Sequence, residues 1–403
     1  MTSKSNSAEA PEPITHYRVL ALAAPILLSN ATIPLLGAVD TAVAGRIPQA
    51  EPLAAVGVGA IVIASVYWLF GFLRMGTTGL AAQAVGAGDR IETNALLLRG
   101  LLVAMVGALL AFMLFVPLAN FTFRSSDLDA LVAELAWDYV GIRIFSAPAA
   151  IGLYAIIGWL FANERMRDVL YIQLLQNGLN IVLDPVLALG FGWGIQGLAA
   201  ASLIAEWSGF LLGLWMCRAA LPSPQSIDWP RILDKARLKR MASVNRDILL
   251  RSVLLQAVVY SFVVMGGRFG TVTLAANHVL MQFLEISVFA LDGLAFGAES
   301  LIGQAKGARD VVRLRRAALL TSLWAGIIAL IMALIFDGTI IIFDVFNYIF
   351  ANKSQVLIGL AKFYFWVFRV WLFPERVITK STEMWSIFLP YTFFDVRLPR
   401  NSH

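Results

Sequence analysis

The sequence predicts an all-α, polytopic membrane protein with two parallel six-helix bundles, the second of them incomplete, and about ten membrane spans in total. Of the 403 residues, 59% are hydrophobic and only 14% are charged, whereas soluble domains carry about 25% charged residues. Most of the chain also divides into apolar runs of the length that a bilayer-spanning helix needs, which is about 20 residues. A soluble protein could not bury this much apolar surface.

Six apolar runs make up the first half of the chain. The polar residues 1–17 are expected to form a disordered cytoplasmic tail. Residues 18–220 are predicted to form a first lobe of six membrane helices. The runs lie at residues 19–44, 53–82, 96–118, 137–162, 169–189 and 195–217.

The second half repeats this organisation less completely. A basic cytoplasmic linker is predicted at 221–246, followed by a second lobe at 247–403. Its clear runs lie at 248–267, 274–302 and 317–336. Beyond about residue 336 the pattern degrades, because the run at 340–350 is short and charged residues interrupt the run at 356–373. We therefore expect the second lobe to be truncated or altered after residue 336.

The basic residues alternate between successive loops. Odd-numbered loops carry only the isolated Arg46, Arg124 and Arg268, whereas even-numbered loops carry several basic residues each or the basic linker, apart from the second loop with its single Arg90. By the positive-inside rule the even-numbered loops and the N-terminus are cytoplasmic. The net charge of +5 is explained by this placement, so no nucleic-acid partner is predicted. The single cysteine, Cys217, excludes an internal disulfide.

An internal repeat relates the two halves. Gly76, Leu80, Gln83, Ala84 and Gly86 recur with the same residue types 221 positions later. A chance match of small residues is the alternative, but a glutamine in fixed register among glycines argues against it. Six spans separate the copies, so both insert the same way up, which is a repeat plan of secondary transporters. A complete second half would require a longer chain, by roughly two spans.

Carboxylates and amides inside the predicted spans are the candidate functional groups. The first run contains Asp40, and the fifth contains Gln173, Asn177, Asn180 and Asp184 at helical spacings of four, three and four. Charged groups inside a membrane are costly, and they usually face a cavity or another helix. Asp40 could instead lie at the water interface, and the amides could simply hold helices together. Proline after Asp184 predicts a kink.

Further charged residues in the spans leave several pairings open. Glu206 lies one turn after Ser202 in the sixth run, and it could pair with Arg74, Arg143 or Arg251. The acidic residues of the eighth run share one helix face, where they form either a second polar lining or pairs with Arg251 or Arg268; they are Glu285, Asp292 and Glu299. Because Asp40 and Asp184 have no acidic counterparts in the second half, any ion coupling is expected in the first lobe.

Several of these segments together resemble the multidrug and toxic compound extrusion (MATE) transporters, specifically the DinF branch. The similarity covers about residues 16–336. It rests on the segments 22–30, 34–43, 73–83, 180–184, 245–252 and 303–310. The resemblance implies two six-helix lobes, no enzymatic activity and no cofactor, and efflux of amphiphilic, often cationic compounds driven by entry of H⁺ or Na⁺.

The resemblance also implies roles for particular residues. Coupling to protons or cations is expected at a set of first-lobe polar residues, and a Na⁺ site is possible at Asp40, Asn180 and Asp184. Bending of the first helix is expected near Pro25 or Pro34. The coupling set consists of Asp40, Asp184, Asn180, Tyr139 and Ser202.

Two other classes of protein remain open at this stage. A degenerate family member that does not transport is one, because of the altered C-terminal region. An intramembrane aspartyl protease is the other, but the glycine typical of such enzymes two residues before the aspartate is replaced by Ala38. We expect a monomer in a bacterial cytoplasmic (inner) membrane, with the lipid bilayer and small amphiphilic substrates as its partners.

Overall fold

The described part of the chain is entirely helical, as predicted. The computed structural model describes residues 13–47, 51–125, 129–221, 228–268 and 271–350, and these contain no β-strand. Side chains at 258–284 and 337–350 lie outside this description. Within the described residues, eight segments are long and apolar enough to cross a membrane. The protein is therefore an all-α polytopic membrane protein.

The first six predicted runs each correspond to one span. Several spans consist of two consecutive helices because the helix is interrupted near its middle or its end. The elements are α1 (His16–Asn30) with α2 (Thr32–Ala44), α3 (Glu51–Leu69) with α4 (Phe72–Gly86), α5 (Arg90–Ser125), α6 (Ala130–Arg143) with η1 (Ile144–Ser146) and α7 (Ala147–Ala162), α8 (Met166–Asp184) with η2 (Pro185–Gly190), and α9 (Gly194–Met216).

The boundaries of the predicted linker and tail were partly wrong. A short helix, α10 (Trp229–Ile232), lies within the predicted linker, and α11 (Lys235–Arg268) begins eleven residues before 246. The start of α11 could not be predicted from hydropathy, because the residues at its beginning are basic and a helix can continue beyond the apolar part that spans the membrane. At the other end, α1 begins at His16, where Thr15 accepts a hydrogen bond from the Arg18 N–H (3.2 Å) as its N-cap.

The last described helices are longer than their apolar runs. α12 spans Thr271–Gly307, and α13 spans Val311–Phe350. The short run at 340–350 is thus no separate span but the continuation of α13. The run at 356–373, and with it most of the region predicted to be altered, lies outside the described residues.

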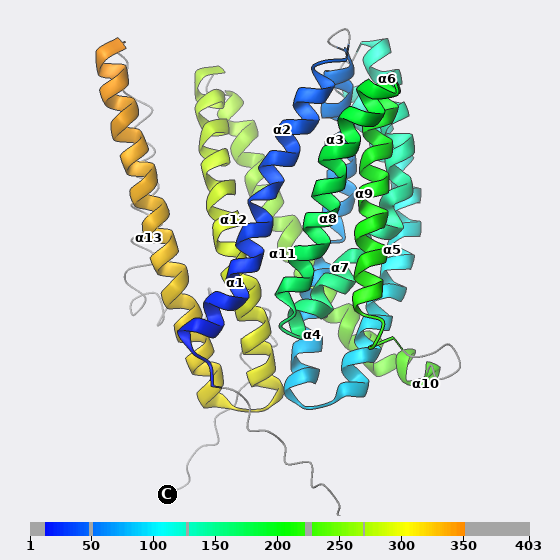
Figure 1. Ribbon diagram of the computed structural model, residues 1–403, viewed down its shortest axis with the longest axis vertical. Helices are drawn as coiled ribbons and strands as arrows, with labels where there is room; N and C mark the ends of the chain where they lie inside the picture. Colours follow the sequence, from blue (N-terminus) through cyan, green and yellow to red (C-terminus); the bar gives the residue numbers. More distant parts are fainter. Residues whose placement is uncertain (1–12, 48–50, 126–128, 222–227, 269–270, 351–403) are drawn as a thin grey trace, which may run out of the picture.

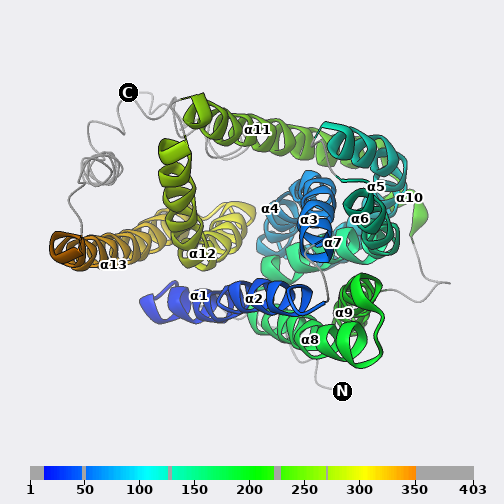
Figure 2. The same ribbon diagram turned by 90° about the horizontal axis from the view of Figure 1, so that it is seen from above.

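The connections with most of the basic residues lie at one end of the bundle, which we call the basic end (Figure 1). The turns after α4, α7 and α12, the short α10 and the start of α1 all lie there, as alternating spans require. Seen from above, α3 to α9 form one group, α12 and α13 lie to the other side, and α1 with α2 and α11 flank the space between (Figure 2).

The two copies of the internal repeat contact each other at the basic end. An added Cβ on Gly86 of α4 would overlap the carbonyl oxygen of Gln304 in α12. Reciprocally, an added Cβ on Gly307 would overlap the carbonyl oxygen of Gln83. Each repeat therefore presents its glycine to the other's glutamine, as in a two-fold interface. Only glycine allows the backbones of α4 and α12 to approach this closely.

The glycine contact predicts a position-specific loss of stability. Substitution G86A should lower the apparent Tm of the purified protein, because the new methyl group forces α4 and α12 apart; overpacking of this kind costs about 1–3 kcal/mol. Nothing lies within 4 Å of an added Cβ on Gly79 of the same helix, so G79A is the matched control. Equal Tm values for the two variants would contradict the reciprocal contact.

Candidate functional site

Four of the predicted coupling residues meet between α2, α8 and α9. The amide nitrogen of Asn180 lies 3.0 Å from Asp184 Oδ2 and 3.2 Å from Asp40 Oδ1, and its oxygen accepts from Ser202 Oγ at 3.0 Å. This amide orientation satisfies every partner, whereas the reverse would set the amide oxygen against two carboxyl groups. Asn180 therefore joins both acidic residues to α9.

The carboxyl groups of Asp40 and Asp184 converge on this one amide and interact electrostatically with each other. Asp184 is 1% exposed and Asn180 4%, while Asp40 is half-buried. Among the described residues, no donor reaches Asp184 Oδ1. Two charged carboxylates that approach the same amide repel each other, and a shared proton or an enclosed cation would relieve that repulsion. The prediction that these residues face other helices rather than lipid agrees with this arrangement.

The local sequence of α8 explains why these groups face inward. The predicted polar stripe faces α2 and α9, where Asn177 donates to Thr32 Oγ1 at 2.5 Å. Proline directly after Asp184 cannot donate a backbone hydrogen bond. The helix continues there as a π-helical turn, Pro185–Gly190, in which the Phe191 N–H bonds to the Val186 carbonyl at 2.9 Å. Such turns are frequent at functional sites.

Tyr139 borders the carboxyl pair from α6. Its side chain is 6% exposed, and it interacts electrostatically with Arg143 and Asp40. Its ring packs on Gly59 of α3, where an added Cβ would lie 2.7 Å from the ring. The phenol is thus held beside Asp40 by packing. Its predicted place near the acidic site agrees with the structure.

The two predicted hinge prolines lie on either side of a helix break. Pro25 is inside α1 and Pro34 is in the first turn of α2. Between them the helix is interrupted at Ala31, and Thr32 Oγ1 donates to the Ser29 carbonyl at 2.7 Å. Of the residues of α2, only Val43 and Ala44 are buried. α2 therefore carries Asp40 on a helix with few buried contacts.

Glu206 has a buried partner that the sequence left undecided. Arg143 Nη2 donates to Glu206 Oε1 and Arg143 Nη1 contacts Oε2, both at 2.9 Å. Arg143 also donates to Ser146 Oγ at 3.1 Å. The pairing joins α6 to α9 next to the carboxyl pair, so a permanent positive charge lies near Tyr139. Only a contact map or co-variation between the two positions could have identified it.

The acidic residues of α12 are not arranged as one uniform lining. Glu285 is exposed, whereas Asp292 and Glu299 interact electrostatically with Arg74 of α4. Arg74 lies over the ring of Phe296, 3.9 Å from the centroid, and Phe296 stacks on Phe161 of α7 at 4.9 Å. Arg251 interacts electrostatically with Glu299, which is one of the two pairings that the sequence left open. The other candidate partner, Arg268, has a side chain outside the described residues.

A bundle of membrane-length helices that holds a buried carboxyl pair away from lipid is typical of membrane transport proteins. The MatE family model matches residues 25–186 and 248–368. The chain belongs to the MatE family, whose members are transporters and not enzymes.

Curated relatives support the same assignment. The chain is 37% identical to DNA damage-inducible protein F of Escherichia coli over 78% of this chain and 69% of the relative. It is 29% identical to Protein DETOXIFICATION 44, chloroplastic, of Arabidopsis thaliana over 73% of this chain and 59% of the relative. It is 27% identical to a probable multidrug resistance protein NorM of Rhizobium meliloti over 76% of this chain and 66% of the relative. The chain thus spans about three fifths to two thirds of their length.

Solved structures share the fold at low sequence identity. A MOP-superfamily transporter from Pyrococcus furiosus matches with a TM-score of 0.71 at 21% identity, covering 85% of this chain and 75% of that one. The structure of MATE in the straight conformation matches with a TM-score of 0.71 at 22% identity, covering 85% of this chain and 76% of that one. The structure of MATE in the bent conformation matches with a TM-score of 0.70 at 21% identity, covering 79% of this chain and 73% of that one.

The buried ion pair predicts an asymmetric effect of mutation. E206Q should destabilise the protein by about 3–5 kcal/mol, because Arg143 would remain buried without its counter-charge. The double variant R143M/E206L should recover part of the loss, since it removes both charges. Apparent Tm is the measurement, and E134Q, at an exposed position of α6, is the control. A double variant no more stable than E206Q would argue against the pair.

Proposed function

We propose that this chain is a secondary active efflux transporter that exports amphiphilic, cationic drugs or toxic compounds, coupled to inward movement of H⁺ through Asp40 and Asp184. We place it in a bacterial cytoplasmic membrane, with the basic end and the N-terminus in the cytoplasm and as a monomer. The observation that carries the proposal is the convergence of two carboxyl groups on one asparagine inside a membrane bundle.

Substrate class follows from relatives and from charge. The names of the relatives refer to multidrug resistance and detoxification. An acidic site enclosed by apolar helices attracts cations, because low-dielectric walls strengthen its field. When the site holds protons instead, that attraction is lost. Proton and cationic substrate therefore compete, which is the basis of antiport.

The grouping of the two carboxyl groups supports H⁺ as the coupling ion. Asp40 and Asp184 both approach the amide of Asn180, and one proton shared between them removes their repulsion without any further ligand. A Na⁺ ion would instead need several oxygen ligands, for which Asp40, Asn180 and Asp184 are the candidates.

In the proposed mechanism, release or binding of the proton changes the conformation of the protein through movement of α2. Asp40 joins this lightly packed helix to α8 and α9, and the break at Ala31 with its flanking prolines gives α2 a place to bend. Loss of the shared proton introduces repulsion between Asp40 and Asp184 and favours separation of the helices. The reciprocal glycine contact holds α4 and α12 together at the basic end, which supports a proposed state that is closed on the side we place in the cytoplasm.

The test is ethidium efflux from a pump-deficient bacterial host. D40N should reduce efflux to the level of the empty host, because an amide cannot exchange a proton, while leaving the amount of membrane-inserted protein unchanged. The control is E134Q, which removes an exposed carboxylate of α6 and should transport normally. Efflux retained by D40N would refute the coupling role. No efflux by the native chain would favour the non-transporting alternative.

A further inference from the structure

We propose that a cavity at the basic end, between the two halves of the chain, binds the phosphate group of an anionic ligand. The cavity has a volume of about 510 Å³ and is formed by α4, α5, the start of α11 and the end of α12. It lies outside the carboxyl site and takes no part in the proposed transport cycle of Asp40 and Asp184.

Positive charge exceeds negative charge around this cavity. Five cationic side chains line it, against two carboxylates, Asp89 and Glu92. The cationic residues are Arg99, Arg237, Arg240, Lys306 and Arg309. Charges of one sign gathered in a partly enclosed space repel one another, and a bound anion relieves that repulsion.

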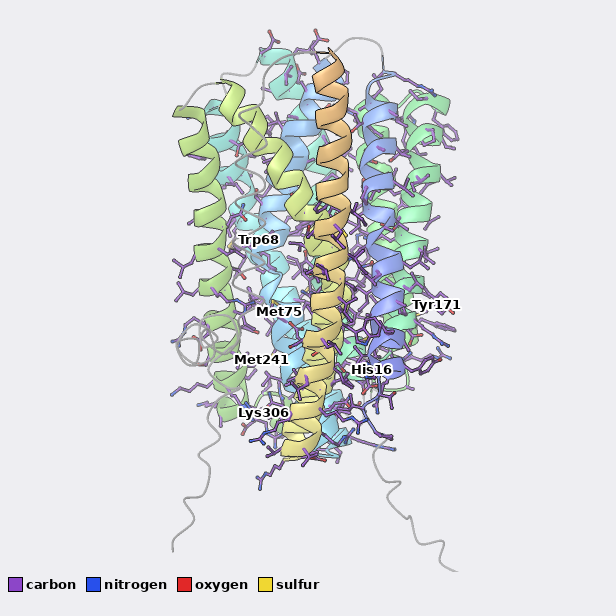
Figure 3. All side chains as sticks on the ribbon, turned by 90° about the vertical axis from the view of Figure 1, so that its left-hand side faces the viewer. His16, Trp68, Met75, Tyr171, Met241 and Lys306 are labelled. Carbon is purple, nitrogen blue, oxygen red and sulfur yellow. The ribbon has the colours of Figure 1, made fainter. Side chains whose placement is uncertain are left out.

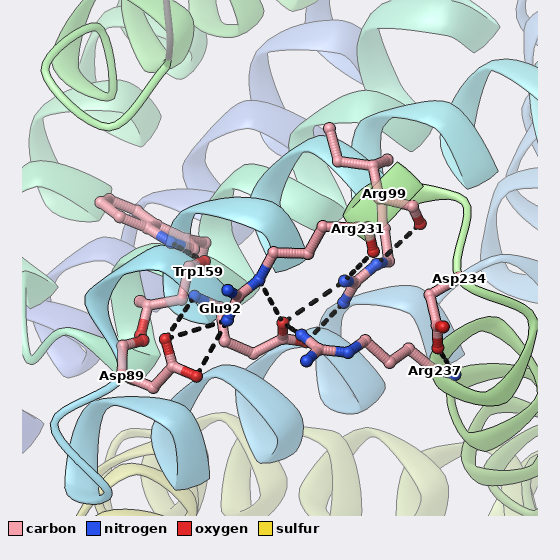
Figure 4. A network of polar contacts seen from close by, with 9 residues as sticks. Asp89, Glu92, Arg99, Trp159, Arg231, Asp234 and Arg237 are labelled. Carbon is pink, nitrogen blue, oxygen red and sulfur yellow. Dashed lines mark hydrogen bonds and ion pairs between the residues drawn. The ribbon is translucent and has the colours of Figure 1, made fainter. Parts of the chain in front are cut away.

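The two carboxylates are already shared by several guanidinium groups (Figure 4). Glu92 Oε1 accepts from Arg99 at 2.6 Å, while Glu92 Oε2 contacts Arg231 at 3.4 Å and also Arg237. Asp89 pairs with Arg231 at 3.0 Å. Asp89 and Glu92 therefore supply less negative charge to the cavity wall than its five cationic side chains supply positive charge.

The hydrogen bonding of Arg240, at the start of α11, supports the same conclusion. Its Nη2 donates to the neutral amide oxygen of Gln83 at 3.0 Å. Gln83 belongs to the reciprocal contact between the repeats, so Arg240 is held at the junction of the two halves. A guanidinium whose partner is a neutral amide keeps its full charge and its remaining N–H donors for a ligand.

The chemistry of these side chains suits a phosphate group in particular. Guanidinium groups form paired hydrogen bonds to phosphate oxygens, and basic pockets between membrane helices on the cytoplasmic side bind lipid phosphates. Lys306 lies near the same end of the molecule in Figure 3. The general rule for cytoplasmic loops requires basic residues at this end, but it does not require them to converge on one cavity.

The position of the cavity gives the ligand a structural effect. Arg99 comes from the first half, Arg237 and Arg240 from the start of α11, and Lys306 and Arg309 from the end of the second repeat. An anion bound to all of them bridges the halves beside the Gly86–Gln304 contact. The bound ligand therefore stabilises the closed basic end.

The full chain in lipid nanodiscs provides the test, with apparent Tm as the measurement. Nanodiscs of phosphatidylcholine are compared with nanodiscs that also contain phosphatidylglycerol, and inorganic phosphate is titrated into the former against sodium chloride of equal ionic strength. R240Q/R309Q removes two lining charges; R315Q/R316Q removes two exposed charges on α13 that do not line the cavity.

The native chain and R315Q/R316Q should gain Tm with the anion, and R240Q/R309Q should need about tenfold more of it. A gain with phosphatidylglycerol alone identifies a lipid headgroup as the source, whereas a gain with inorganic phosphate identifies a soluble anion. The proposal is overturned if neither anion raises the Tm of the native chain, or if both double variants respond equally. These readouts do not depend on efflux.

Discussion

Two carboxyl groups that converge on one asparagine inside an apolar bundle are the constraint on which the rest of this structure depends. Asp40 and Asp184 repel each other when both are charged, and Asp184 is buried from the water that would screen it. Asn180 lies between them and is held by Ser202, while no donor among the described residues reaches Asp184 Oδ1. Under the proposed mechanism a shared proton stabilises the pair, and a change in its occupancy is coupled to movement of a helix.

The helix positioned to move is α2. It is joined to α1 through a break, it buries few of its residues, and its polar contacts with α8 include those of Asp40 and Thr32. At the basic end, α4 and α12 approach closely through reciprocal glycines, and hydrogen bonds from Arg99 join α5 to α10. The proposed alternating-access movement would therefore be larger at α2 than at this end.

The sequence predicted those parts of the site that follow from local periodicity. The spacing of Gln173, Asn177, Asn180 and Asp184 defined one face of a helix. The repeat around Gln83 and Gln304 indicated two equivalent halves, but it did not predict that these two helices contact each other. The pairing of Arg143 with Glu206 and the stacking of Arg74 on Phe296 could not be predicted, because each depends on which helices pack together over long sequence separations. The start of α11 was not predicted, because hydropathy identifies the part of a helix that lies in the membrane and not the part that extends beyond it.

The central claim is that Asp40 and Asp184 share a proton, and infrared spectroscopy of the purified protein tests it most directly. At neutral pH the native chain should show the C=O stretch of a protonated carboxylic acid buried from water, and this signal should be absent from D40N and D184N. Sodium ions should leave it unchanged. A native spectrum without the signal, or one in which Na⁺ abolishes it, would contradict the shared proton.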